Sequence, residues 1–166
     1  MSYNANPDTK IYPFVLVTTD LDQALPAKSA VDTKSEIEGI GSDPTTGWAV
    51  IGKIEEGVEV SGEEDNSVMT SDGAKLVLSE KITISMEDLN ISEYSDLRAN
   101  LHNTDCQVIL VDPNAVGAGD DPNVVPHCKD IKLQVYPNVS DMLKISINGE
   151  QTASNLDNIF TIATLS

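Results

Sequence analysis

Hydrophobic and polar residues alternate along residues 47–89, and no other feature of the sequence constrains the fold as strongly. Apolar residues at even spacing mark the beginning and the end of this run: Ile54, Val58 and Val60, then Ile82, Ile84 and Met86. Because successive side chains of a strand point to opposite faces, this spacing predicts half-buried β-strands. Asp72-Gly73 lies between them and predicts a hairpin turn, since glycine tolerates the positive φ of a tight turn. We therefore expect an antiparallel sheet with one apolar face, interrupted by an acidic loop at 63–65.

The rest of the chain also favours strands, with a single helix. Alternating or continuous apolar runs predict strands at 11–18, 104–112, 124–136, 143–148 and 160–163. Tyr94, Leu97 and Leu101 recur at helical spacing, so residues 90–101 are predicted to form a helix that lies on a sheet. The predicted fold is mainly β: two packed antiparallel sheets, a sandwich or a barrel, flanked by this helix. Since no repeat or boundary is visible, residues 1–166 are expected to form a single domain.

Residues 20–46 form a long, mostly polar stretch that is predicted to be a loop. A loop of this length without structure of its own is uncommon in a compact domain and is usually functional or disordered. Five apolar residues give it something to bury: Leu21, Leu25, Val31, Ile37 and Ile40. We therefore expect an assembly arm that becomes ordered against a partner subunit. An insertion without a partner is the alternative.

The charge of the chain restricts its partners. It has 27 acidic and 10 basic residues among 166, a formal net charge of -17. A protein that grips DNA or RNA needs clustered lysines and arginines to neutralise phosphates, so ordinary nucleic-acid binding is excluded. No apolar run approaches the roughly 20 residues of a membrane-spanning helix. The first residues also lack a signal-peptide pattern, so Cys106 and Cys128 are expected to be free buried thiols.

No residue pattern predicts a catalytic, cofactor or metal site. His127 and Cys128 are adjacent, but neighbouring strand residues point to opposite faces and cannot act as a base and its nucleophile. The loop after Asp112 matches a calcium-binding loop in part but lacks the final bidentate glutamate. A weak calcium site at 112–121 remains an alternative, whereas the spacing of the cysteines and histidines does not fit zinc.

A series of short motifs resembles the bacteriophage major tail proteins, the subunits of the phage tail tube. The motifs are Trp48-Ala49-Val50-Ile51-Gly52, Ile54-Glu55-Glu56-Gly57-Val58-Glu59, Ser71-Asp72-Gly73-Ala74-Lys75-Leu76 and Ile82-Thr83-Ile84-Ser85-Met86. One helix follows them, as in that family. The similar layout covers residues 11–165, and the last third of the chain matches by layout alone.

The resemblance implies two packed sheets with one helix, a fold shared with type VI secretion tube proteins. It implies hexameric rings that stack into the tail tube, through which DNA passes without specific binding. Tape-measure, terminator and baseplate proteins would be further partners, with no membrane and no cofactor. The implied location is the virion tail, after assembly in the host cytoplasm.

A channel for DNA should not hold DNA. An acidic wall repels phosphates at short range, with screening over about 8–10 Å at physiological salt. Glu55, Glu59 and Glu87 lie on predicted polar strand faces and are the expected lumen-facing residues, with small polar residues such as Thr83 and Ser85 beside them.

Two other functions are alternatives to the tail tube. One is another virion ring protein, such as a tail terminator or a baseplate component, and the other is a monomeric β-sandwich binding module. An enzyme would need a perturbed acid pair in a cleft, which the spacing does not indicate.

Overall fold

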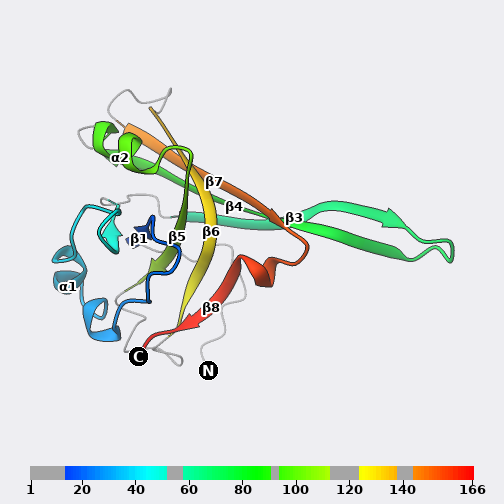
Figure 1. Cartoon of the computed structure of the whole chain (residues 1–166), viewed down its shortest axis with the longest axis horizontal. Helices are drawn as coiled ribbons and strands as arrows, with labels where there is room; N and C mark the ends of the chain where they lie inside the picture. The colour runs from blue at the N-terminus through cyan, green and yellow to red at the C-terminus, as the bar shows by residue number, and fades with distance from the viewer. Residues whose placement is uncertain (1–13, 52–57, 91–93, 113–123, 138–143) are drawn as a thin grey trace.

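The computed structural model describes residues 14–51, 58–90, 94–112, 124–137 and 144–166 (Figure 1). The strands are β1 (Phe14–Thr18), β2 (Ala49–Val50), β3 (Val58–Met69), β4 (Lys75–Asn90), β5 (Thr104–Val111), β6 (Val124–Pro137), β7 (Lys144–Ala153) and β8 (Phe160–Thr164). The α-helices are α1 (Lys34–Glu38) and α2 (Tyr94–Leu101), and the 3-10 helices are η2 (Lys28–Ala30) and η4 (Leu156–Asn158). The mainly β fold predicted from the sequence is confirmed.

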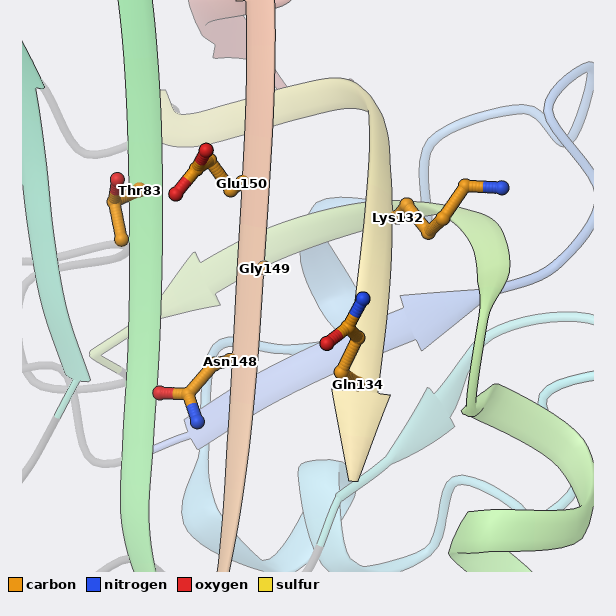
Figure 2. A pocket seen from close by; sticks show the side chains of 6 residues that line it. All are labelled: Thr83, Lys132, Gln134, Asn148, Gly149 and Glu150. Atoms are coloured by element: carbon orange, nitrogen blue, oxygen red, sulfur yellow. The ribbon is translucent and has the colours of Figure 1, made fainter. Parts of the chain in front are cut away.

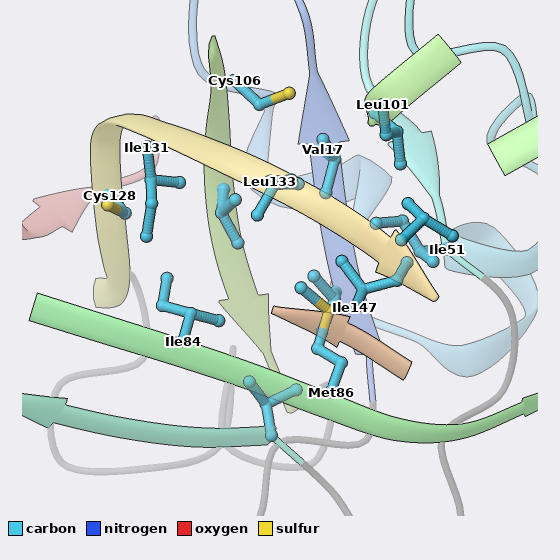
Figure 3. Close-up of a cluster of buried hydrophobic side chains, with 14 of the residues drawn as sticks. Val17, Ile51, Ile84, Met86, Leu101, Cys106, Cys128, Ile131, Leu133 and Ile147 are labelled. Carbon is cyan, nitrogen blue, oxygen red and sulfur yellow. The ribbon is translucent and has the colours of Figure 1, made fainter. Parts of the chain in front are cut away.

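All the strands belong to one antiparallel sheet, in the order β2-β1-β5-β6-β7-β4-β3, with β8 paired to β6. β6 changes partner along its length, because its first residues pair with β8 and its last residues with β7. The strand bends between these two partners, and the two halves of the sheet face each other across a common core (Figure 3). The prediction of two packed sheets is therefore confirmed only in part, since hydrogen bonds join all the strands into one open sheet.

The main core fills the space between the two halves of the sheet (Figure 3). Val17 of β1 and Met86 of β4 belong to the same buried cluster, although three strands lie between β1 and β4 in the sheet order. Leu97 and Leu101 of α2 complete the cluster, as their helical spacing predicted. The packing is close at Gly149 of β7, where a Cβ atom would lie 2.7 Å from Leu133 Cδ2. A side chain at this position would therefore force Leu133 and Ile131 to shift.

A second apolar cluster lies on the other face of β1 and β5, beneath residues 20–46. Phe14 and Leu16 of β1 belong to it, whereas Val15 and Val17 belong to the main core. Every residue of β1 is consequently buried. β5 alternates between the two clusters in the same way, which confirms the prediction of a strand buried on both faces.

Residues 20–46 are largely irregular, as predicted, but they also contain η2 and α1. Thr33 caps α1, because its side-chain oxygen accepts a hydrogen bond from Glu36 N at 3.2 Å. Thr33 followed by Glu36 has the spacing of a capping box, which is a sequence signal for a helix start. The two ends of the segment are held together, since Thr19 N donates to Pro44 O at 3.0 Å. The segment is thus a folded strap over the second cluster.

α2 begins at Tyr94 among the described residues, whereas the sequence predicted a helix from residue 90. Asn90 is instead the last residue of β4. Arg98 Nη1 donates to Val135 O at 2.6 Å, and Val135 N donates to His102 Nδ1 at 3.1 Å. β5 pairs with β6 only as far as Leu133, so these two side chains take the place of a neighbouring strand. They satisfy a stretch of the β6 edge that would otherwise be open to strand addition.

β3 and β4 form a long hairpin whose far end projects from the rest of the molecule (Figure 1). The pairing of β4 with β7 ends at Glu80, whereas its pairing with β3 continues out to Lys75. The predicted Asp72-Gly73 turn is confirmed: Gly73 has a φ of 86°, which favours glycine. The acidic loop expected at 63–65 is wrong, because these residues belong to β3, where Glu63 and Glu64 pair with β4 and Asp65 lies at a register shift.

Candidate functional site

The projecting end of the hairpin carries an exposed row of apolar side chains. Val68, Leu76 and Leu78 are 45%, 50% and 43% exposed, and we call these three residues the tip row. Val68 and Leu76 are paired across the two strands and therefore share one face of the hairpin, and Leu78 lies beside them at a shift in the strand register. Met69, beside the turn, is 70% exposed. Grouped apolar side chains in water are typical of a binding surface.

The tip row continues the alternating apolar sequence of β4 beyond two shifts in its register with β3. Ile84 and Ile82 point into the main core, and steps of two residues from them reach Glu80, Leu78 and Leu76. Up to Glu80 these alternate residues are covered by the rest of the protein. Beyond Glu80 the described part of the chain leaves them open to solvent. The outer part of β4 thus has the residue pattern of a core strand without the core.

The opposite face of β4, β7 and β6 is polar (Figure 2). Side chains from all three strands surround a shallow hollow of about 350 Å³: Thr83, Lys132, Gln134, Asn148 and Glu150, with Gly149 among them. Beside the hollow, Ser85 Oγ donates to Asn148 Oδ1 at 3.0 Å. We call this surface the polar sheet face. It presents mainly amide and hydroxyl groups, which form hydrogen bonds with water without adding charge.

Two lysines of the polar sheet face are paired with carboxylates. Lys81 Nζ lies 3.1 Å from Glu150 Oε2 and 3.8 Å from Glu63 Oε1. Lys132 Nζ lies 3.8 Å from Asp105 Oδ1. Exposed ion pairs of this kind contribute little to stability, but each one neutralises a positive charge that would attract a phosphate.

The predicted lumen-facing glutamates lie wholly or partly outside the described residues. Glu55 lies outside the described residues, and the side chains of Glu59 and Glu87 are likewise outside the described part. The strand register places Glu59 of β3 opposite Ser85 of β4, which is on the polar sheet face. The lumen-facing role of all three glutamates stays a prediction.

The predicted arm residues contact the chain's own sheet. Val31 and Ile37 are 0% exposed, and Leu25 and Ile40 pack against the same second cluster. Leu21, at 44% exposed, keeps much of its surface in water. The apolar side chains of 20–46 therefore bury against β1 and β5 within one subunit. The β3–β4 hairpin was expected to lie within the sheet, but it is the element that projects.

A buried polar contact anchors the start of the strap to the sheet. Gln107 Nε2 donates to Asp20 O at 2.7 Å and to Gln23 O at 3.1 Å. Gln107 Oε1 lies 2.9 Å from His127 Nε2. Gln107 and His127 are 3% and 8% exposed, so water cannot readily replace the hydrogen-bond partners of either side chain. Buried groups of this kind are costly to separate from their hydrogen-bond partners.

Acidification should weaken this anchor. Burial, and to a smaller extent the charge of Lys129, lowers the pKa of His127 below its ordinary value. The unfolded chain therefore binds the proton at higher pH than the folded protein does. The stability contributed by neutral His127 is fully present above a pH of about 6.5 and falls below it, by at most about 1.4 kcal/mol per pH unit.

Urea denaturation of the wild type and of His127→Gln between pH 8 and pH 5.5 measures this effect. Glutamine keeps a group that can bond to Gln107 but does not titrate, so the wild type should lose more stability than the variant on acidification. Parallel losses in the two proteins would contradict a role for His127.

The described residues place both cysteines in the protein interior. Cys106 and Cys128 are free and buried, as predicted, and burial raises the pKa of both thiols to about 12. Within the described ranges no three His, Cys, Asp or Glu side chains gather where they could hold a metal ion. Residues 113–123, which include most of the candidate calcium loop, lie outside these ranges. None of the described helices is long and apolar enough to cross a bilayer.

The fold, the tip row and the polar sheet face define an antiparallel β protein with a projecting hairpin. No protein-family model matches its sequence, and no curated protein matches it.

Proposed function

We propose that the protein is a structural subunit that assembles with copies of itself into hexameric rings, which stack to form a phage tail tube. The tip row is the observation that carries this proposal. The hairpin extends beyond its own sheet and carries a core-like apolar face into solvent. A neighbouring copy of the subunit is the partner that would cover this face in an assembled ring or tube.

The open edges of the sheet support self-assembly. β3 is an end strand, and within the described part of the chain its outer edge pairs with no other strand. β8 pairs with β6 alone among the described strands. Unpaired strand edges are avoided in monomers and can be satisfied by neighbouring subunits. Contacts between two different surfaces of identical subunits close into a ring or extend as a filament.

The polar sheet face suits the wall of a channel for DNA. Its amides and hydroxyls carry no charge, and Lys81 and Lys132 are neutralised by acidic neighbours. The chain as a whole has a net charge of -17, which repels phosphates. We therefore assign this face, with Glu87 of β4 and Glu59 of the neighbouring β3, to the lumen. The tube would meet tape-measure, terminator and baseplate proteins in the virion.

The state of the purified protein tests the proposal. Copies that each carry a charge of -17 repel one another, so assembly should increase with salt as the screening length falls to about 8 Å near 0.15 M. Negative-stain electron microscopy and light scattering over a range of protein and salt concentrations would follow it. Stacked rings or tubes support the proposal, isolated rings favour a terminator or baseplate component, and a monomer at every concentration favours a binding module.

A further inference from the structure

We infer that the root of the hairpin is a clamp that fixes the direction in which the tip row projects. The root is the point where β4 parts from β7, at the pair Glu80 and Ala153. Up to this point β4 has a partner strand on each side, and beyond it β3 is its single partner in the sheet. A two-stranded ribbon is marginally stable in water and would bend freely without support. The residues at the root supply that support on both faces.

On the core-facing side, the root is attached to η4. Leu156 N donates to Glu80 Oε2 at 2.8 Å. The side chain of Leu156 packs so closely on β3 that a Cβ atom at Gly62 would lie 3.0 Å from its Cδ1 atom. Gly62 and Glu80 belong to the two different strands of the hairpin. η4 therefore holds both strands where they leave the body.

On the polar side, Lys81 joins three strands. Its Nζ atom lies 3.1 Å from Glu150 of β7 and 3.8 Å from Glu63 of β3. The hydrogen bond that Lys81 donates to Glu150 raises the pKa of Lys81, so the ammonium group is charged throughout the physiological range. Lys81 thus ties β3, β4 and β7 together one residue inside the root.

An irregularity in β3 lies directly beyond the clamp. The register between β3 and β4 shifts between Glu64 and Asn66 and again between Asn66 and Ser67. Irregularities of this kind bend a strand and increase its twist. The hairpin therefore changes direction just after it leaves the sheet, and the clamp determines the position from which that change starts.

The clamp controls orientation more than folding. Exposed ion pairs contribute little to stability, so its loss should leave the subunit folded while the hairpin moves more freely. Its effect on assembly rests on the proposed function, because a ring interface needs the tip row in one position. Its effect on the direction of the hairpin does not depend on that function.

The test compares the full-length double variant Glu80→Ala/Lys81→Met with Glu80→Gln/Lys81→Arg, which keeps the acceptor and the positive charge. Each protein also carries Ser71→Cys at the turn and Lys129→Cys on β6 as sites for nitroxide labels. Both positions are exposed, whereas the native thiols are buried with a raised pKa and should stay unlabelled. Electron paramagnetic resonance on dilute subunits measures the distribution of distances between the labels. Light scattering of the unlabelled proteins, without the label-site substitutions, measures assembly.

We expect a narrow distribution in the parent and in Glu80→Gln/Lys81→Arg, and a clearly broader one in Glu80→Ala/Lys81→Met. The threshold concentration for assembly should rise about tenfold in Glu80→Ala/Lys81→Met, because each hairpin must then be ordered on binding. A distribution as narrow as that of the parent would overturn the clamp while leaving the proposed function standing. If the distribution is broadened in Glu80→Ala/Lys81→Met but the wild-type protein never assembles, the proposed function is overturned and the clamp stands. If Glu80→Ala/Lys81→Met has a broadened distance distribution but assembles at the wild-type concentration, the clamp has no role in assembly.

Discussion

Leu76→Asp is expected to prevent self-assembly at the concentrations at which the wild type assembles, while leaving the subunit folded. Leu76 is half exposed in the single subunit, so its replacement should change the free energy of unfolding by about 0.5 kcal/mol or less. In an assembled interface the same position would bury a carboxylate without a partner, which costs several kcal/mol. A penalty of about 3 kcal/mol per contact raises the concentration needed for assembly by roughly a hundredfold. Light scattering and negative-stain microscopy would measure this shift.

Ser67→Asp is the matched control for the tip row. It adds the same charge to the same hairpin, but Ser67 pairs with Val77, one position out of step with Val68 and Leu76, and therefore lies on the other face. The control should assemble at nearly the wild-type concentration. Equal loss of assembly in both variants would mean that added charge, and not the buried apolar face, is responsible. Unimpaired assembly of Leu76→Asp would remove the main support for the proposed function.

Ile37→Ala is expected to destabilise the subunit itself, by about 2–5 kcal/mol. Ile37 is 0% exposed and packs in the second cluster, so its truncation leaves a cavity between α1 and the sheet. Urea denaturation followed by circular dichroism would measure the change. The control is Leu21→Ala in the same strap. Its side chain is 44% exposed, so truncation should lower the free energy of unfolding by about 0.5 kcal/mol or less.

Deletion of residues 22–43 should have a still larger effect. It would uncover the second cluster, including Phe14 and Leu16 of β1, and remove Val31 and Ile37. We expect an unfolded or aggregated protein. An arm that is ordered only by a partner subunit would instead give a folded deletion variant that no longer assembles. The same denaturation experiment thus distinguishes a structural strap from an assembly arm.

The strands were predictable because their sequences show clear apolar patterns. Alternation along β4 and β7, and the continuous apolar run of β5, correspond to strands with one and two buried faces respectively. The turn at Asp72-Gly73 was equally clear, since the positive φ of Gly73 is a local requirement. α2 was predicted from the stripe that contains Leu97 and Leu101.

The length of the hairpin and the role of the strap were not predictable in the same way. Glu63 and Glu64 have the composition of a loop, but their strand conformation comes from pairing with β4, which sequence period alone does not reveal. The apolar residues of 20–46 indicated burial without indicating what would cover them. One local signal was present, because Thr33 and Glu36 have the spacing of a capping box at the start of α1. The exposed tip row continues the apolar pattern of β4, so the sequence could not distinguish it from core.

The tight contact at Gly149 offers a criterion for recognising distant relatives of this protein. A Cβ atom there would lie 2.7 Å from Leu133 and 3.0 Å from two atoms of Ile131, so any side chain would require these two residues of β6 to shift or to be smaller. A candidate homologue should therefore carry glycine in the strand that corresponds to β7, or show a compensating reduction in size across from it. Such paired substitutions could be sought in sequences too divergent for overall identity to be informative.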